Sequence, residues 1–180
     1  DAAEVTDTLY PYYRLQEEGY EVLVAAPEER PYHLVQHDGA PDWDITVESK
    51  GYVFASDIAF RDVREEEYLG LVISGGRAPE YIRYDEDLMR ITRHFGETGK
   101  PIASVCHGIE IVAKAGVIKG RTVTTVAKCR FDAEVCGATY VDQPVVVDGS
   151  IVTARTFHDN APWMREYVKM LNAARDALQA

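Results

Sequence analysis

The sequence predicts an α/β fold with a largely parallel sheet. Helical and strand-like segments alternate along nearly the whole chain. Two short apolar runs, Tyr68–Ser74 and Ile102–Val105, have the length and composition of buried strands. No repeat, low-complexity tract or flexible linker separates the segments. We therefore expect residues 1–180 to form a single domain.

The predicted elements follow from apolar periodicity and from the glycines and prolines that end each segment. In order, they are helix 5–18, strand 20–26, short strands 44–47 and 52–54 within an irregular segment 28–67, strand 68–74, helix 79–98, strand 102–105, helix 107–115, a strand near 122–126, a short helix near 131–136, strands near 138–147 and 151–154, and helix 160–178.

Composition excludes several classes of function. The 30 acidic and 19 basic residues give a net charge of −11, which argues against a nucleic-acid partner, because phosphate binding needs clustered Lys and Arg. No apolar run approaches the roughly 20 residues that span a bilayer, and no signal-peptide pattern is present. Three cysteines do not form a disulfide framework. We expect a cytoplasmic protein with no membrane partner.

Cys106 is the most informative residue. A buried strand ending at Val105 leads directly into a helix, so Cys106 must occupy the turn and project over the carboxyl edge of the sheet. Gly108 keeps this tight connection free of a side chain. Backbone N–H groups and the helix dipole at such a turn stabilise a thiolate nucleophile. The residues alone leave open that Cys106 is an inert buried thiol.

Two glycines and a histidine could complete a site around this thiol. Gly75 and Gly76 end the neighbouring strand, where backbone can approach a ligand closely. The N–H groups of Gly76 and His107 could form an oxyanion hole, and the His107 ring could act as general acid or base. A simple tight turn is the alternative for the glycines. The histidines show no metal-ligand spacing, so we expect no metal.

The chain resembles the ThiJ/PfpI family of the class I glutamine-amidotransferase-like superfamily, and the PfpI branch in particular. The likeness covers nearly the whole chain. It implies a three-layer α/β sandwich, flavodoxin-like in outline, with a cysteine nucleophile elbow and no cofactor. The matching segments are Glu4 with Tyr10–Leu15, Ser74–Glu80, Ser104–Gly108, Ala115–Gly120, Val145–Gly149 and Trp163–Tyr167.

The resemblance assigns roles to individual residues. Cys106 corresponds to the nucleophile, and Glu4 to an acidic residue that hydrogen-bonds its sulfur. Glu80 corresponds to a glutamate that reaches across a subunit interface to orient His107. This arrangement implies a homo-oligomer, a dimer or a hexamer, with Glu80 near an interface. Without the resemblance, Glu4 and Glu80 would be read as carboxylates that stabilise helix N-termini.

The sequence departs from the family pattern at several places. Family members have a strand ahead of the position of Glu4, and this sequence starts after that strand. Because loss of a central strand would expose two strand edges, we expect an upstream segment. Val126 replaces a tyrosine of the protease branch, and residues 33–50 are longer than that branch needs. Gly75, Val126 and His158 are candidate substrate-binding residues. Cys129 and Cys136 have no assigned role and are expected to be structural.

The favoured function is conversion of small 2-oxoaldehydes to hydroxy acids, a glyoxalase or deglycase activity of stress protection, through an adduct on Cys106. One alternative is an intracellular cysteine peptidase of the PfpI type, acting on peptides. Another is a non-catalytic redox or stress sensor in which Cys106 is oxidised to a sulfinic acid. An amidotransferase is disfavoured, because no downstream His–x–Glu pair is present.

Overall fold

A four-stranded sheet forms the centre of the computed structural model, which describes residues 1–180. The strands are β5 (Leu71–Ile73), β6 (Ile102–Val105), β10 (Ile151–Ala154) and β9 (Val145–Asp148), in that spatial order. The first three are parallel and β9 is antiparallel to β10. Every residue of β6 and β10 is buried, as expected for parallel strands covered on both faces.

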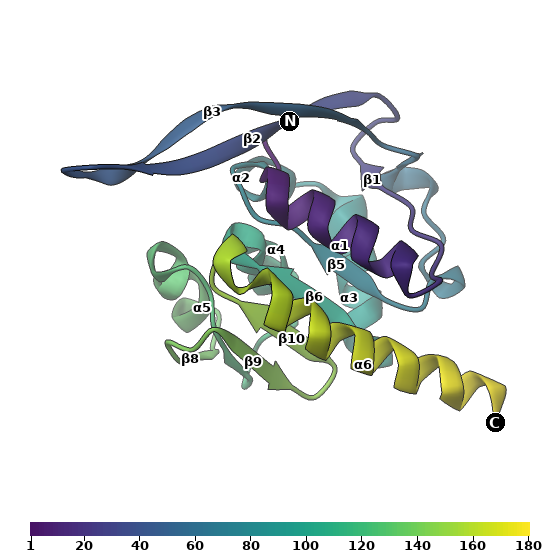
Figure 1. Ribbon diagram of the computed structural model, residues 1–180. Helices are drawn as coiled ribbons and strands as arrows, with labels where there is room; N and C mark the ends of the chain where they lie inside the picture. The colour runs from purple at the N-terminus through teal and green to yellow at the C-terminus, as the bar shows by residue number, and fades with distance from the viewer.

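Two helices cover one face of this sheet. They are α1 (Val5–Glu17) and α6 (Asn160–Gln179), which also pack against each other. Trp163 and Tyr167 of α6 are among the largest fully buried side chains, and they lie over Ala103 and Val152 in one hydrophobic cluster. Figure 1 shows both helices on the same side of the sheet.

The opposite face is covered by α3 (Glu86–Thr98) and α4 (Ile109–Lys114). Their apolar side chains form the larger hydrophobic cluster, with Met89, Phe95 and Ile111 fully enclosed. The predicted three-layer sandwich is therefore confirmed. The remaining elements are β1 (Ala25–Ala26), β4 (Ile58–Ala59), η1 (Phe60–Asp62), η2 (Glu65–Glu67), α2 (Ala78–Ile82), η3 (Cys106–Gly108), β7 (Thr122–Val123), η4 (Ala127–Cys129), α5 (Arg130–Val135), β8 (Thr139–Tyr140) and η5 (Phe157–Asp159).

A long hairpin projects from this body (Figure 1). It pairs β2 (Pro31–Ala40) with β3 (Trp43–Ala55), antiparallel and with two irregularities in register. The expectation of an irregular segment over 28–67 was wrong here. The alternation of polar and apolar residues belongs to a ribbon with two largely solvated faces, and Trp43 and Ile45 are exposed.

Other predicted elements have different limits. The predicted helix 79–98 is two helices, because Asp85 caps α3 by accepting hydrogen bonds from the N–H groups of Asp87 and Leu88. The predicted strand 138–147 divides at Pro144 into β8 and β9. None of the helices combines the length and hydrophobicity that crossing a bilayer requires.

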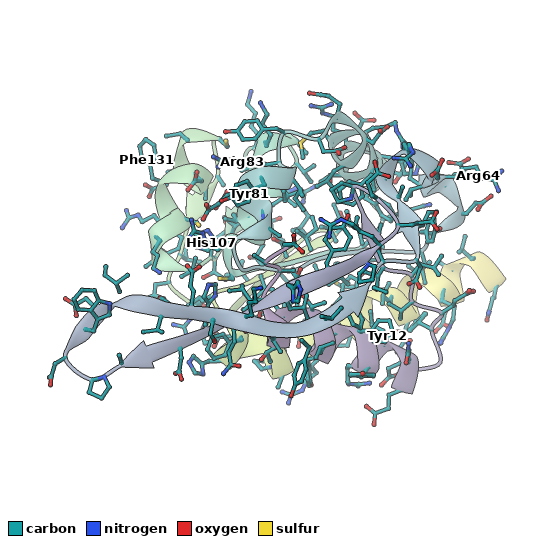
Figure 2. All side chains as sticks on the ribbon, turned by 90° about the horizontal axis from the view of Figure 1, so that it is seen from above. Tyr12, Arg64, Tyr81, Arg83, His107 and Phe131 are labelled. Carbon is teal, nitrogen blue, oxygen red and sulfur yellow. The ribbon has the colours of Figure 1, made fainter.

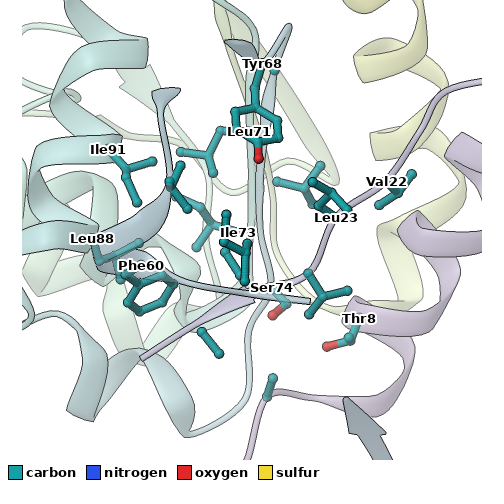
Figure 3. Close-up of a pocket in the computed structure, with 18 of the residues that line it drawn as sticks. Thr8, Val22, Leu23, Phe60, Tyr68, Leu71, Ile73, Ser74, Leu88 and Ile91 are labelled. Atoms are coloured by element: carbon teal, nitrogen blue, oxygen red, sulfur yellow. The ribbon is translucent and has the colours of Figure 1, made fainter. Parts of the chain in front are cut away.

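An apolar cleft of about 330 Å³ separates β5 from the segment that leads into β1. Figure 3 shows Val22 and Leu23 on one wall and Leu71 and Ile73 on the other. Of its 33 lining residues, 26 are hydrophobic, so the cleft offers few polar groups to a ligand. Of the predicted strand 20–26, only Ala25 and Ala26 form a strand, and they pair with Ile58 and Ala59 of β4.

Candidate functional site

Cys106 lies on a strained turn between β6 and α4. Its φ of 56° is in the left-handed region, which a residue with a side chain rarely adopts. The hydroxyl of Thr125 donates a hydrogen bond of 2.8 Å to the Cys106 carbonyl, which fixes the turn from outside. A Cβ on Gly108 would come within 2.9 Å of the Ile73 carbonyl oxygen. The predicted nucleophile elbow is therefore present, and it needs glycine at position 108.

Gly75 and Gly76 form one wall around the sulfur. A Cβ on Gly75 would lie 2.5 Å from Cys106 Cβ and 3.1 Å from Cys106 Sγ. Gly76 has a φ of 85°, and a side chain there would collide with the Ala2 carbonyl oxygen at 2.4 Å. Both glycines are required for the backbone to approach Cys106 this closely.

Two buried carboxyl groups lie near the thiol, and the hydrogen bond from Glu4 to the Cys106 sulfur that the resemblance implied is not among the contacts of the structure. Glu4 is 3% exposed, and its Oε2 accepts a 2.7 Å hydrogen bond from the N–H of Asp7 as it caps α1. Asp7 is 1% exposed, and its Oδ1 accepts a 3.0 Å hydrogen bond from the amide of Asn160. Asp7 Oδ2 lies over Gly75, 2.6 Å from where a Cβ would be. The site thus holds two carboxyl groups where the sequence predicted only Glu4.

Burial changes the ionisation of both carboxyl groups. It raises the pKa of Glu4, and it raises the pKa of Asp7 to about 7, with the charge of Glu4 as a second cause. Near neutral pH, Asp7 can therefore either accept or donate a proton. In the sequence Asp7 stands three residues after Glu4, the N-cap of α1, and this spacing places it in the first turn of the helix without indicating its burial.

The same burial changes Cys106. Desolvation, followed by the charge of Asp7, raises the pKa of the thiol to about 12. The backbone N–H groups of His107 and Gly76 act in the opposite direction and lower it. The expected thiolate stabilisation by N–H groups is thus present but outweighed. The resting residue is a thiol, and it must lose its proton during reaction.

The ring of His107 is engaged by residues other than Cys106, although its backbone N–H acts on the Cys106 thiol. Its Nδ1 lies 2.7 Å from Oε1 of Glu110, a residue that is only 6% exposed, and 3.3 Å from Sγ of Cys129. Arg83 donates a 2.9 Å hydrogen bond to the other oxygen of Glu110. Adjacent residues at the elbow therefore face different surroundings. The sequence did not identify Glu110, because many first-turn glutamates have no such partner.

Glu80 is paired elsewhere within the chain. Its carboxylate accepts two hydrogen bonds from Arg77, at 2.5 and 2.9 Å, and this pairing lowers the pKa of Glu80. Arg77 also donates a 2.9 Å hydrogen bond to Glu48 of the hairpin. The hairpin thereby passes over the side of the site that contains His107 (Figure 2). The structure does not bring Glu80 into contact with His107 of the same chain.

The other residues singled out from the sequence are Val126, His158 and Cys136. Val126 is half-buried and packs against the larger hydrophobic cluster. His158 is exposed on η5, with its ring 4.3 Å from that of Phe157. Cys136 is half-buried at the end of α5, and all three cysteines are free.

Comparison with known proteins agrees with this architecture. The DJ-1/PfpI family profile matches residues 1–170. The chain is 41% identical over 171 residues to Deglycase TK1284 of Thermococcus kodakarensis, covering 95% of each protein. It is 39% identical over 168 residues to Deglycase PfpI of Pyrococcus furiosus, covering 93% of each. The crystal structure of a ThiJ/PfpI domain protein from Brachyspira murdochii superimposes with a TM-score of 0.82 at 20% identity, covering 96% of this chain and 91% of that one.

The profile covers nearly all of the chain, and the relatives match over almost their full length. The strand, the strained cysteine and the glycine wall occur in the segments that suggested the resemblance from the sequence. The chain belongs to the DJ-1/PfpI family.

Proposed function

We propose that this protein is a deglycase-type enzyme that acts on small 2-oxoaldehydes, and on their adducts with amines, through a covalent adduct at Cys106. The observation that carries the proposal is the thiol on a strained elbow, enclosed by the glycine wall and beside Asp7, whose pKa of about 7 suits proton transfer. The similarity to enzymes named deglycases supports it.

The first step is attack by Cys106 on the aldehyde carbon. The S–H proton passes to the ionised carboxylate of Asp7 as the S–C bond forms, and the carbonyl oxygen becomes an oxyanion. In this proposal the N–H groups of Gly76 and His107, which lower the pKa of Cys106, stabilise this charge. The proton then passes from Asp7 to the oxyanion, which gives a hemithioacetal on Cys106 and restores the Asp7 carboxylate.

The second step moves a hydrogen between neighbouring carbons. A base removes the proton from the former aldehyde carbon, the electrons pass through an enediol, and a proton returns to the adjacent carbon. Water then hydrolyses the resulting thioester, releases the 2-hydroxy acid and restores the thiol. Overall, a 2-oxoaldehyde and water become a hydroxy acid, so no external oxidant or reductant is needed.

His107 and Glu110 are suited to this proton transfer. The carboxylate of Glu110 is paired with Arg83 and can only accept hydrogen bonds, so it holds the hydrogen of His107 on Nδ1. The other ring nitrogen, Nε2, is then a free base. We propose Glu110 as the residue that positions His107 within one subunit.

The surroundings of the sulfur favour a small electrophile over a peptide. Backbone at Gly75 lies close against Cys106 on one side, and Val126 stands where the protease branch has a tyrosine. A peptidase would use Glu80 of a second subunit to orient His107, and this shared arrangement in an oligomer stays a proposal.

The experiment compares wild type, Cys106→Ala and Cys136→Ala on methylglyoxal, on a methylglyoxal-modified amine and on a fluorogenic peptide. We expect turnover of the first two substrates by wild type and by the Cys136 control, and none by Cys106→Ala. Turnover of the peptide alone would replace the proposal with a peptidase. Turnover of methylglyoxal by Cys106→Ala would show that Cys106 is not the nucleophile.

A further inference from the structure

Three potential metal ligands converge beside the nucleophile. They are Nδ1 of His107, Oε1 of Glu110 and Sγ of Cys129, which all lie within 4.8 Å of one another. The individual separations are 2.7 Å between His107 and Glu110, 3.3 Å between His107 and Cys129, and 3.7 Å between Cys129 and Glu110. Cys129 is 2% exposed, so the cluster is enclosed on its cysteine side and reached past His107.

The fold holds these three side chains with little freedom. His107 follows the elbow, Glu110 is in the first turn of α4, and Cys129 ends η4. Their separation of up to 22 residues concealed the cluster in the sequence. The clustering therefore results from packing of η4 and α4, which both contribute to the larger hydrophobic cluster.

We propose that His107, Glu110 and Cys129 form a binding site for a zinc-type divalent cation. Thiolate, imidazole and carboxylate are the ligands that zinc uses, whereas magnesium and calcium prefer oxygen ligands alone. Zinc bond lengths of about 2.0–2.3 Å at tetrahedral angles place ligand atoms about 3.4–3.6 Å apart. The two pairs that include Cys129 are close to this spacing, and the His107–Glu110 pair needs to open by roughly 0.7 Å.

The charges and the outer contacts also suit this cation. A thiolate and a carboxylate together balance the two positive charges of zinc. Arg83 holds the second oxygen of Glu110 at 2.9 Å, which directs Oε1 toward the cluster. Three protein ligands leave a fourth position for water on the side of the half-buried His107 ring.

Binding of the cation changes which atoms of the site carry protons. The S–H bond of Cys129 breaks as its sulfur binds the cation, and this proton leaves to solvent. At His107, the cation takes the Nδ1 position and the ring hydrogen moves to Nε2. The ring then has no free basic nitrogen. If the proposed function holds, a bound cation therefore stops the proton transfer assigned to His107.

The test titrates Co²⁺, a spectroscopic substitute for zinc, into Cys106→Ser protein, in which the neighbouring thiol cannot compete. We expect thiolate-to-cobalt charge transfer in the near ultraviolet and intense tetrahedral ligand-field bands in the visible, both bleached by added Zn²⁺. In the Cys106→Ser background, a second substitution Cys129→Ser should remove the charge-transfer band. The second substitution Glu110→Gln should weaken the affinity for Co²⁺ by roughly tenfold or more. Adding Cys136→Ser is the matched control and should change neither.

A charge-transfer band that survives Cys129→Ser, or one seen in wild type but absent from Cys106→Ser, would overturn the proposal, since another cysteine would then bind the metal. Circular dichroism of each variant tests whether a loss of Co²⁺ binding is due to unfolding. This titration uses no substrate, so its outcome is independent of the proposed reaction. A separate assay links the metal site to the proposed reaction. If Zn²⁺ inhibits methylglyoxal turnover by wild type but not by Cys129→Ser, the bound cation acts on the proposed reaction.

Discussion

Asp7 makes the stability of this protein depend on pH. Its pKa is about 7 in the folded chain, against an ordinary value of 3.8, mainly because it is buried. The folded state therefore holds this proton more tightly than the unfolded chain does. This proton therefore stabilises the folded state fully below about pH 4, and the stabilisation is lost as pH rises through about 7. Over this range the free energy of unfolding falls by at most ~1.4 kcal/mol per pH unit.

We predict that Asp7→Asn removes most of this slope, because asparagine is neutral at every pH and can still accept the hydrogen bond from Asn160. Urea unfolding at several pH values between 4 and 8 measures how the free energy of unfolding changes with pH. Glu4, whose pKa is also raised, leaves a smaller slope of the same sign. The exposed Asp44→Asn is the control and should follow wild type. Equal slopes in wild type and Asp7→Asn would show that Asp7 is not held protonated.

His107 provides a second test at the scale of single residues. Glu110 contacts its ring, whereas Glu80 is paired with Arg77. We predict that Glu110→Ala lowers kcat on methylglyoxal by roughly 100-fold, the size of a general acid–base contribution, and alters the pH profile. Glu80→Ala should leave both nearly unchanged. The opposite ranking would support a triad completed by a neighbouring subunit.

The sequence identified Cys106 because strand, turn and helix are contiguous in the chain, so a local pattern contains the whole geometry. Asp7 was missed for a different reason. Its importance depends on burial against Gly75, which no spacing rule reports. Glu110 and Cys129 were missed because they meet His107 only after η4 packs against α4.

At the scale of elements, the elbow depends on the glycine wall. We predict that Gly75→Ala destabilises the protein by about 1–3 kcal/mol and abolishes turnover, because the new methyl group would lie 2.5 Å from Cys106 Cβ and displace the nucleophile. Thermal unfolding and the methylglyoxal assay measure both effects. Gly39→Ala is the matched control, since nothing lies within 4 Å of its Cβ position. A fully active Gly75→Ala would contradict the close contact.

The elements differ in how well the sequence predicted them. Ile102–Val105 and helix α6 were predicted closely, because buried strands and amphipathic helices carry strong apolar patterns. The hairpin was predicted only in part. The predicted strands 44–47 and 52–54 both lie within β3, whereas β2 was missed because Asp38, Gly39 and Pro41 suggested turns. The break before α3 was signalled by Asp85, a favourable N-cap residue, but the apolar pattern continued across it.

At the scale of the whole molecule, the cleft beside β5 is an apolar cavity of about 330 Å³ (Figure 3). We predict that this chain binds the dye ANS in its native state, since the cleft exposes apolar surface without unfolding. Leu23→Lys in the cleft wall should reduce the fluorescence. Leu178→Lys, at an exposed position on α6, should not. Equal fluorescence from both variants would place the dye elsewhere.

The central claim is that Cys106 forms the covalent adduct through which substrate is converted. The most direct measurement is peptide mapping by mass spectrometry of protein quenched during steady-state turnover of methylglyoxal. We predict one modified peptide, containing Cys106, whose modification disappears as substrate is exhausted and is absent from Cys106→Ala. Continued formation of the hydroxy acid with Cys106 unmodified, or by the Cys106→Ala variant, would contradict the account.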